Sequence, residues 1–230
     1  MKGYGSFCPI AKAAEILAER WTLLVLREIL FAGSRHFNDL RRGVPQMSPT
    51  LLSKRLQTLE DVGIVARQPG ADGHTWEYHP TSACQELRPV IESIGHWGQH
   101  WVRSKLTRDE LDPGMLMWYI HRHFVKKHLP PRRIVVYIEI TDVIKRMKHW
   151  WLVLEAQKVD LCLQDPGHEV DITLMTDLLS LTQVYMGDLS LERARSTSRI
   201  KISGPRALIQ SMPSWFARSR FAEDNPLSVT

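Results

Sequence analysis

The residues with the clearest chemical potential share one face of a predicted helix. Between Pro49 and Val62, leucines recur three or four positions apart, which predicts an amphipathic helix with one buried stripe. The opposite face carries short polar and cationic side chains at the same spacing: Thr50, Ser53, Lys54 and Gln57. Such side chains can reach base edges or phosphates in the major groove of DNA. Taken alone, the same pattern also describes an ordinary surface helix.

Cations gather around this helix. Those between residues 35 and 55 are Arg35, Arg41, Arg42, Lys54 and Arg55, and Asp39 is the one acidic residue among them. A local cationic patch favours binding to the phosphate backbone more than a high net charge does, and the net charge here is only +5. We expect Arg41, Arg42 and Arg55 to contact phosphates, and Arg67 and His74 to reach the DNA from a hairpin.

The flanking sequence predicts the elements that position these residues. Ser48 is a good helix N-cap, and Pro49 suits the first helical position. A short helix begins at Cys8-Pro9, and the other predicted helices and strands of this region are helices 21–31 and 37–42 and strands 64–67 and 75–78. The segment Pro69–Gly73 is a strong turn signal between the strands. Two helices, a turn, a polar-faced helix and a hairpin define a winged helix-turn-helix.

Ordered motifs in this region resemble the HxlR family of bacterial regulators. They are Cys8-Pro9, Trp21-Thr22-Leu23-Leu24, Arg35-His36-Phe37-Asn38-Asp39-Leu40, the run 48–56 and the run 59–65. The resemblance covers roughly residues 7–105. It implies DNA binding by a homodimer whose first and last helices form the interface. The matching last helix spans about Ser82 to Trp101, and its apolar positions are Leu87, Val90, Ile91 and Ile94. A two-fold dimer reads half-sites about 34–36 Å apart.

A second domain follows a charged segment, Thr107–Gly114, which contains the breaker Asp112-Pro113-Gly114. We therefore predict a winged helix-turn-helix domain over 1–108 and an α+β domain over 113–225. The helices expected there are 115–124, 177–186, a short one after Ser190, and a last one from Gly204-Pro205 that ends or kinks at Pro213. Strands are predicted at 133–141, 150–163, 170–176 and 199–203.

The C-terminal part resembles sterol-carrier-protein-like domains. The motifs that carry this resemblance are the runs 171–178, 187–191 and 200–208. It implies an α+β fold with an apolar cavity for a lipid or another small hydrophobic molecule. Trp118, Trp150 and Met175 are bulky, adaptable side chains that together suit the lining of such a cavity, although core packing is the favoured interpretation of any single one of them.

Cysteine and histidine offer two further chemistries. Cys8, Cys84 and Cys162 are far apart and include no CxxC pair, which favours a reducing compartment. Cys8 is either a small packing residue or, as in some members of the resembled family, a thiol switch. His96 and His100 could share one metal ion, but no third ligand lies at suitable spacing. We therefore expect no metal site and no cofactor.

Motifs of enzymes are missing from the sequence. It contains no phosphate-binding glycine loop, no nucleophile elbow and no HExxH. It also contains no signal peptide and no apolar stretch long enough for a bilayer, so we expect a cytoplasmic protein without membrane attachment. The proportions of hydrophobic residues (43%) and charged residues (24%) are those of a folded globular chain.

Together these observations predict a dimeric, sequence-specific DNA-binding transcription regulator that responds to a small hydrophobic ligand bound by its second domain. The alternative is a lipid carrier or a remnant enzyme domain, in which the helix-turn-helix serves only dimerisation. An acidic or apolar outer face on helix 49–62 would favour that alternative, and the sequence has neither. A second domain that is empty and purely structural also agrees with the sequence.

Overall fold

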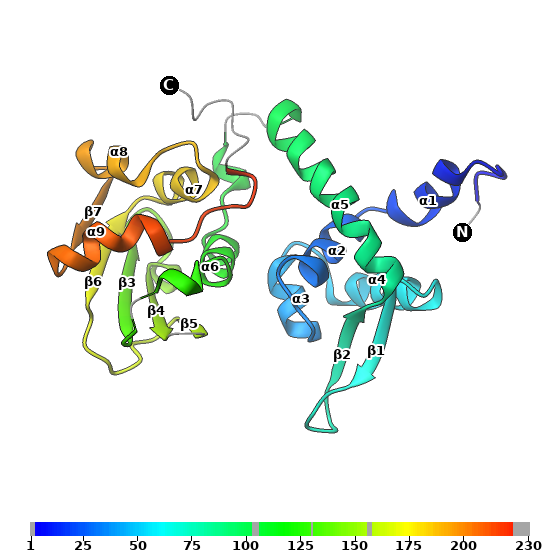
Figure 1. The fold of residues 1–230 in the computed structure, drawn as a ribbon, viewed down its shortest axis with the longest axis horizontal. Helices are drawn as coiled ribbons and strands as arrows, with labels where there is room; N and C mark the ends of the chain where they lie inside the picture. The colour runs from blue at the N-terminus through cyan, green and yellow to red at the C-terminus, as the bar shows by residue number, and fades with distance from the viewer. Residues whose placement is uncertain (1–2, 103–105, 130, 156–157, 223–230) are drawn as a thin grey trace. The chain divides into compact units, whose positions relative to one another are not determined.

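The computed structural model describes residues 3–102, 106–129, 131–155 and 158–222. The chain divides after Gly95 into two compact units, here called the first unit and the second unit (Figure 1). Each unit has a hydrophobic core built only from its own residues. The division falls near the end of a helix that begins at Ser82. The domain boundary expected between residues 108 and 113 stays a prediction.

The first unit is a set of helices followed by a two-stranded hairpin. Its elements are α1 (Pro9–Leu17), α2 (Thr22–Leu30), α3 (Phe37–Gly43), α4 (Pro49–Asp61), β1 (Val65–Pro69), β2 (Trp76–Pro80) and α5 (Ser82–Trp97). The strands pair antiparallel, with Arg67 opposite Tyr78. This order of elements confirms the predicted winged helix-turn-helix.

Helix α4 forms where its capping residues and its leucine stripe predict. The Ser48 hydroxyl accepts a hydrogen bond from the Leu51 backbone N–H at 3.2 Å, and this satisfies one of the free donors of the first turn. Leu52, Leu56 and Leu59 are almost completely buried in the core of the first unit. Burial of this stripe fixes which face of α4 remains exposed.

The end of α5 differs from the prediction. We expected one helix from Ser82 to about Trp101, but the α-helix ends at Trp97 and continues as a π-helix over Gly98–Val102. Gly98 lies at this change. Glycine is among the weakest helix formers, so the change of hydrogen-bond pattern is least costly there.

The second unit is α+β. Its helices are α6 (Pro113–Arg122), α7 (Leu178–Met186), α8 (Leu191–Ser196) and α9 (Arg206–Trp215). Its strands are β3 (Ile134–Ile140), β4 (His149–Glu155), β5 (Lys158–Cys162), β6 (Ile172–Thr176) and β7 (Ile200–Ser203). Asp112, Asp177 and Ser190 each cap the helix that follows them.

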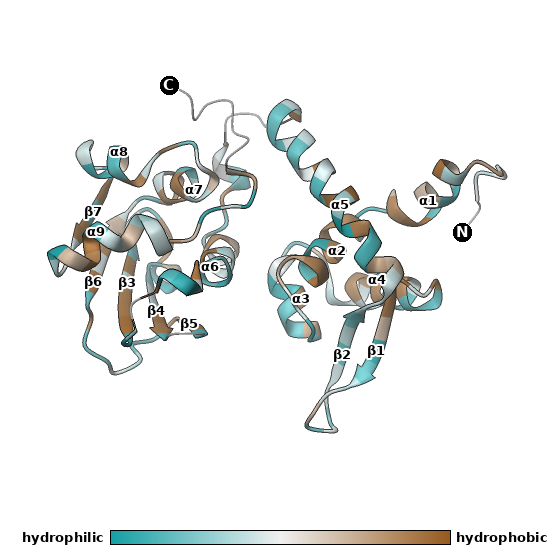
Figure 2. Ribbon diagram, in the orientation of Figure 1, coloured by the Kyte–Doolittle hydropathy of each residue, from teal (hydrophilic) through white to brown (hydrophobic). Residues whose placement is uncertain are grey.

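The strands form one sheet in the order β5-β4-β3-β6-β7. The central pair, β3 and β6, is parallel, and the other pairs are antiparallel. Ile138, Trp150 and Leu174 lie next to one another on the face that packs against α6, α7 and α9 in the core. Figure 2 shows the apolar character of the strands. Because side chains alternate along a strand, Tyr137, Trp151 and Met175 lie on the other face.

Two predicted elements of the second unit needed correction. The stretch 150–163, which was expected to be extended throughout, forms two antiparallel strands in which Glu155 pairs with Lys158. Helix α9 includes Pro213 and continues to Trp215, so the expected end at Pro213 is wrong, whereas a kink there stays a prediction. No helix of the described residues is both long enough and apolar enough to cross a membrane.

Candidate nucleic-acid interface

The outer face of α4 is a polar, solvent-exposed surface. All four side chains that helical spacing places there are exposed: Thr50, Ser53, Lys54 and Gln57. The Gln57 amide nitrogen donates to Asp61 Oδ1 at 2.9 Å, which holds the amide in one orientation. Helical periodicity therefore predicted correctly that these four side chains are exposed on one face of α4. The four residues are called the α4 face below.

Helix α3 supplies cations beside the turn that leads to α4. Arg41 and Arg42 lie in its last turn and are exposed. The Arg42 guanidinium forms an ion pair with Asp39, one turn earlier, at 3.1 Å. An exposed pair of this kind contributes little stability, so it competes only weakly with a phosphate.

The hairpin forms a wing with a cation held on an aromatic ring. The Arg67 guanidinium lies over the Trp76 ring at 4.2 Å, and both side chains are exposed. Trp76 was not among the residues predicted for this surface. The hairpin register could have indicated it, because Trp76 lies diagonally across from Arg67. The ring orients the charge on the wing.

The turn of the wing is organised by Asp72. Its Oδ1 accepts from the backbone N–H of Thr75 at 2.8 Å and of His74 at 2.9 Å. These hydrogen bonds, the one from Thr75 first, lower the pKa of the Asp72 carboxyl because they stabilise its charged form. The exposed His74 is therefore held at the turn by its backbone.

Arg55 lies elsewhere than predicted. Its side chain is only 10% exposed, and its Nη2 donates to Glu19 Oε2 at 2.9 Å and to the Arg20 carbonyl at 3.3 Å. Position 55 follows Leu52 by one turn, so it falls on the buried side of α4. We expected a phosphate contact, but the guanidinium instead fastens α4 to the turn between α1 and α2.

Arg35 is also used inside the unit. Its Nη1 donates to the carbonyls of Ile29 at 2.9 Å and Ser34 at 3.0 Å. The predicted cationic patch therefore shrinks to Arg41, Arg42 and Lys54. Net charge along the sequence could not separate these roles, because an arginine that bonds carbonyls and one that faces solvent look identical in a sequence.

Apolar side chains are exposed on α1, just before it, and on α5. No residue of α1 is buried, and Phe7 and Ile10 are 99% and 79% exposed. On α5, Val90 and Ile94 are exposed, whereas Ile91 is buried in the core of the first unit. Of the four α5 positions that we expected at an interface, Leu87 and Ile91 pack inward. The exposed residues Phe7, Ile10, Val90 and Ile94 are called the apolar surface below.

The cysteines are unpaired and differ in environment. Cys8 is half-buried at the N-cap of α1, and its backbone N–H donates to the Ser6 hydroxyl at 3.1 Å. Cys84 is buried in the core, and burial raises the pKa of its thiol to about 11. Cys162 is half-buried on β5. Among the described residues, no three or more side chains are placed to hold a metal ion, and His96 and His100 belong to no such group.

The predicted ligand-lining residues of the second unit do not share one space. Trp150 lies in the core, and its Nε1 donates to the Met147 carbonyl at 2.6 Å. Trp118 is buried on α6, with its ring beside His121. Met175 is 38% exposed on the opposite face of the sheet from Trp150. The strand alternation at residues 172–176 could have separated Met175 from the core residues.

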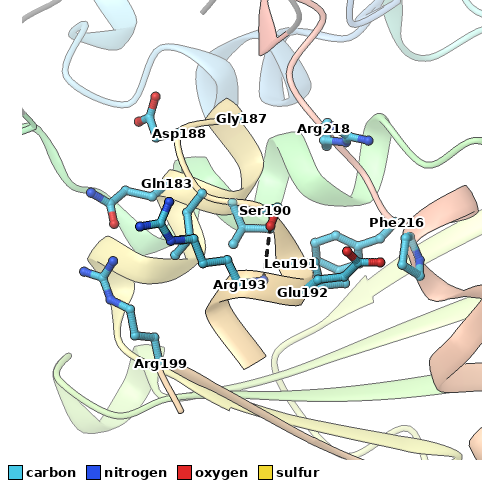
Figure 3. A pocket seen from close by; sticks show the side chains of 13 residues that line it. Gln183, Gly187, Asp188, Ser190, Leu191, Glu192, Arg193, Arg199, Phe216 and Arg218 are labelled. Carbon is cyan, nitrogen blue, oxygen red and sulfur yellow. Dashed lines mark hydrogen bonds between the residues drawn. The ribbon is translucent and has the colours of Figure 1, made fainter. Parts of the chain in front are cut away.

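A different pocket opens in the second unit, next to the C-terminal end of α7. Its volume is about 700 Å³, and it is lined by both polar and apolar side chains (Figure 3). They include Gln183, Leu189, Arg193, Arg199, Phe216 and Arg218. None of Trp118, Trp150 and Met175 lines it.

The fold and the α4 face define a winged helix-turn-helix regulator joined to a second, α+β domain. Residues 16–106 match the HxlR-like helix-turn-helix family, and residues 132–216 match the SCP-2 sterol transfer family. The chain belongs to the HxlR family of transcriptional regulators and carries a C-terminal SCP-2 domain.

Two curated relatives of this chain are named as HTH-type transcriptional regulators. The chain is 37% identical over 126 residues to the uncharacterized HTH-type transcriptional regulator Rv3095 of Mycobacterium tuberculosis. These residues are 54% of this chain and 73% of the relative. The chain is 33% identical over 97 residues to the regulator YvaP of Bacillus subtilis, covering 41% and 89%. The reduced form of YodB from B. subtilis, a solved structure, is 26% identical, with coverage of 42% and 95% and a TM-score of 0.36.

Proposed function

We propose that the chain is a cytoplasmic, dimeric regulator that binds an operator sequence-specifically and responds to a small molecule held by its second domain. The observation that carries the DNA-binding part is the α4 face. Its four polar side chains are all exposed, and the opposite stripe of the same helix is buried. A helix presented in this way, after α3 and before a wing, suits insertion in the major groove.

The side chains divide by the contacts that their chemistry allows. Thr50, Ser53 and Gln57 are neutral donors and acceptors that suit base edges. The cations of this surface, which suit phosphates, are Lys54 from the α4 face, Arg41 and Arg42 from α3, and Arg67 from the wing. His74, at the turn of the wing, can reach the backbone of the adjacent groove.

Two copies of the chain join through the apolar surface in this proposal. A monomer that leaves Phe7 and Ile10 in water loses the stabilisation that burial of those side chains would supply. Only the half-buried Ile16 and Leu17 pack α1 against the core of its own unit, and Ile10 stays exposed, so a partner copy is the natural source of further packing. A two-fold dimer then presents two α4 faces to two half-sites.

The second domain acts as the sensor. Its pocket, of about 700 Å³, is within the range of small-molecule sites. A ligand changes DNA binding only if it binds one arrangement of the dimer more tightly than another. The alternative, a carrier domain with a helix-turn-helix used only for dimerisation, explains the α4 face as an ordinary helix surface but gives no reason for the exposed cations Arg41 and Arg67 on α3 and the wing.

Binding to DNA from the promoter region upstream of the gene tests the proposal. Fluorescence anisotropy on labelled promoter fragments should show nanomolar binding that competitor DNA of random sequence does not displace. The substitutions Ser53→Ala and Gln57→Ala should each reduce discrimination against competitor DNA, whereas Lys145→Ala, an exposed change in the second unit, should leave it unchanged. Equal displacement by specific and random DNA would contradict the proposal.

A further inference from the structure

Helix α2 contains a completely buried acid, Glu28, which the DNA contacts described above do not use. Acidic side chains are almost never fully buried unless they are paired. Glu28 Oε1 accepts hydrogen bonds from the preceding Arg27, at 3.1 Å from Nε and at 3.0 Å from Nη2. The Arg27 side chain is 28% exposed, so the pair connects the surface of the unit with its interior. The buried carboxylate therefore fixes the position of the Arg27 guanidinium beside α2.

The same guanidinium reaches the end of α3. Arg27 Nη2 donates to the Gly43 carbonyl at 2.9 Å, and Gly43 is the last residue of α3. Carbonyls in the last turn of a helix have no partner within that helix, so this hydrogen bond satisfies one of them. Helix α3 packs against α2 (Figure 1), and at this point one guanidinium joins the two helices.

Gly43 lies directly against the carboxylate of Glu28. The residue is buried, and a Cβ at this position would overlap the Glu28 side chain. Gly43 belongs to α3 and its φ is not positive, so its backbone conformation does not require glycine. Glycine is also a weak helix former. The reason for a glycine here is therefore the close approach of α3 to Glu28, and this packing together with the Arg27 hydrogen bond is called the α2–α3 contact below.

The α2–α3 contact lies between the cations of α3 and the start of α4. Arg41 and Arg42, which are both exposed, directly precede Gly43. In the turn that follows, Val44 and Met47 are buried in the core of the first unit. The position of Gly43 on α2 therefore determines where the two exposed arginines lie.

We propose that Arg27 and Glu28 are positioning residues for DNA binding, which hold the end of α3 so that Arg41 and Arg42 meet the phosphate backbone. The inference rests on the proposed DNA-binding function and adds two residues that do not themselves touch DNA. Arginine suits this role because its fork of donors binds the Glu28 carboxylate and the Gly43 carbonyl at the same time. Removal of the carboxylate takes away two of the hydrogen bonds that hold this fork.

Replacement of both charged residues tests the proposal on the full chain. The double substitution Arg27→Met with Glu28→Met leaves no unpaired charge in the interior, and exchange of a buried ion pair for apolar residues is often tolerated. Urea denaturation verifies that the variant is folded. Anisotropy titrations with the operator should show an affinity at least about fivefold lower. The slope of log affinity against log salt should fall by about 1–2, because Arg41 and Arg42 lose their phosphate contacts.

A second ion pair provides the matched control. Arg133 Nε lies 2.6 Å from Glu155 Oε1 in the second unit. The double substitution Arg133→Met with Glu155→Met removes the same two charges, so it leaves the net charge as it is in the test variant. It should keep the operator affinity within about twofold of the unaltered chain. Equal losses in both double variants would overturn the proposal.

Combination with changes in α3 distinguishes positioning from a general loss of stability. In a chain that already carries Arg41→Ala and Arg42→Ala, the two methionine substitutions should weaken operator binding by less than about twofold, because the contacts that they position are gone. Residues that only stabilise the fold would weaken binding by the same factor with and without those two arginines. Equal factors in the two backgrounds, or unchanged affinity and slope in the methionine variant, would overturn the proposal.

Gly43→Ala disturbs the same contact from α3 and leaves the ion pair intact. Alanine favours a helix more than glycine does, but its Cβ can be accommodated only if α3 moves away from Glu28. We therefore expect a similar loss of affinity and a similar change of slope. This variant decides the question if the methionine variant does not fold. Operator binding by Gly43→Ala that equals binding by the unaltered chain would contradict the proposed role.

Hydrogen–deuterium exchange without DNA separates this inference from the proposed function. In the methionine variant, peptides that cover residues 37–47 should exchange faster than in the unaltered chain, whereas those of β3 and β4 should not change. If the unaltered chain binds the operator and the variants change neither exchange nor affinity, the positioning role fails and the DNA-binding function stands. If exchange in residues 37–47 rises but the unaltered chain binds no operator, the α2–α3 contact stands, and the proposed function fails together with the positioning role.

Discussion

Lys54 and Arg55 are adjacent cations with opposite environments. Lys54 is exposed on the α4 face, and Arg55 is buried against Glu19. Lys54→Ala should weaken binding to all DNA sequences by a similar factor and reduce the slope of log affinity against log salt by about 1, because one phosphate contact is lost. Anisotropy titrations at several salt concentrations measure this slope. An unchanged slope would show that Lys54 does not contact a phosphate.

Arg55→Ala should act on stability instead. It leaves the Arg20 carbonyl without its guanidinium donor and Glu19 without its partner, so we expect the unfolding free energy to fall by about 1–3 kcal/mol. Urea denaturation followed by circular dichroism measures the change. Lys54→Ala is the control and should stay within about 0.5 kcal/mol of the unaltered chain. A larger loss for Lys54→Ala than for Arg55→Ala would reverse our assignment.

The three thiols should differ in reactivity. Because burial raises the pKa of Cys84 to about 11, this residue remains a thiol at pH 8, and the thiolate is the reactive form. Iodoacetamide at pH 8 should therefore label Cys8 and Cys162, which are half-buried, well before Cys84. Peptide mass spectrometry over a time course identifies the order. Early labelling of Cys84 in the native chain would contradict its burial in the core.

At the scale of elements, the N-cap of α4 offers a test of how the helix is held. Ser48→Ala removes the hydrogen bond to the Leu51 N–H and should lower the unfolding free energy by about 1 kcal/mol. Ser48→Asp keeps an acceptor and should retain most of the stability. Thermal denaturation of the two variants beside the unaltered chain makes the comparison. Equal loss in both variants would mean that the cap contributes nothing.

Prediction from sequence succeeded where a local pattern determines the structure. The leucine stripe and the Ser48-Pro49 start located α4 and its exposed face, and Asp177 and Gly187 bounded α7. It failed at the stretch 150–163, which was expected to be extended throughout. Glu155 and Lys158 interrupt the apolar run of this stretch, and that interruption marks the change from β4 to β5.

The candidate functional residues also include some that a local pattern predicts and others whose role depends on distant parts of the chain. The α4 face follows from helical spacing, but the role of Arg55 depends on Glu19, thirty-six positions earlier in the chain. Trp118, Trp150 and Met175 were chosen for size, and size does not reveal which side of a sheet or helix a residue occupies. The arginines that line the pocket of the second unit, Arg193, Arg199 and Arg218, come from separate elements, so no sequence spacing connects them.

At the scale of the whole molecule, the apolar surface should control assembly. Ile94→Asp places a charge on α5 where the proposal requires a buried contact, so it should convert the dimer to a monomer and weaken binding to a two-half-site operator. Ile144→Asp is the matched control, because Ile144 is an exposed isoleucine of the second unit. Light scattering after size-exclusion chromatography measures both masses. A dimer that survives Ile94→Asp would place the interface elsewhere.

The parallel pairing of β3 and β6 bears on how the second unit is made. Residues 141–171 lie between these two strands, so β3 and its antiparallel partner β4 are synthesised before β6 exists. Until then β3 has an open edge whose side chains are mostly isoleucine and valine, and such edges recruit other strands. Non-local pairing of this kind also forms slowly, since the intervening loop must first close. The emerging chain is therefore most prone to aggregation after β5 has left the ribosome and before Ile172 has followed it.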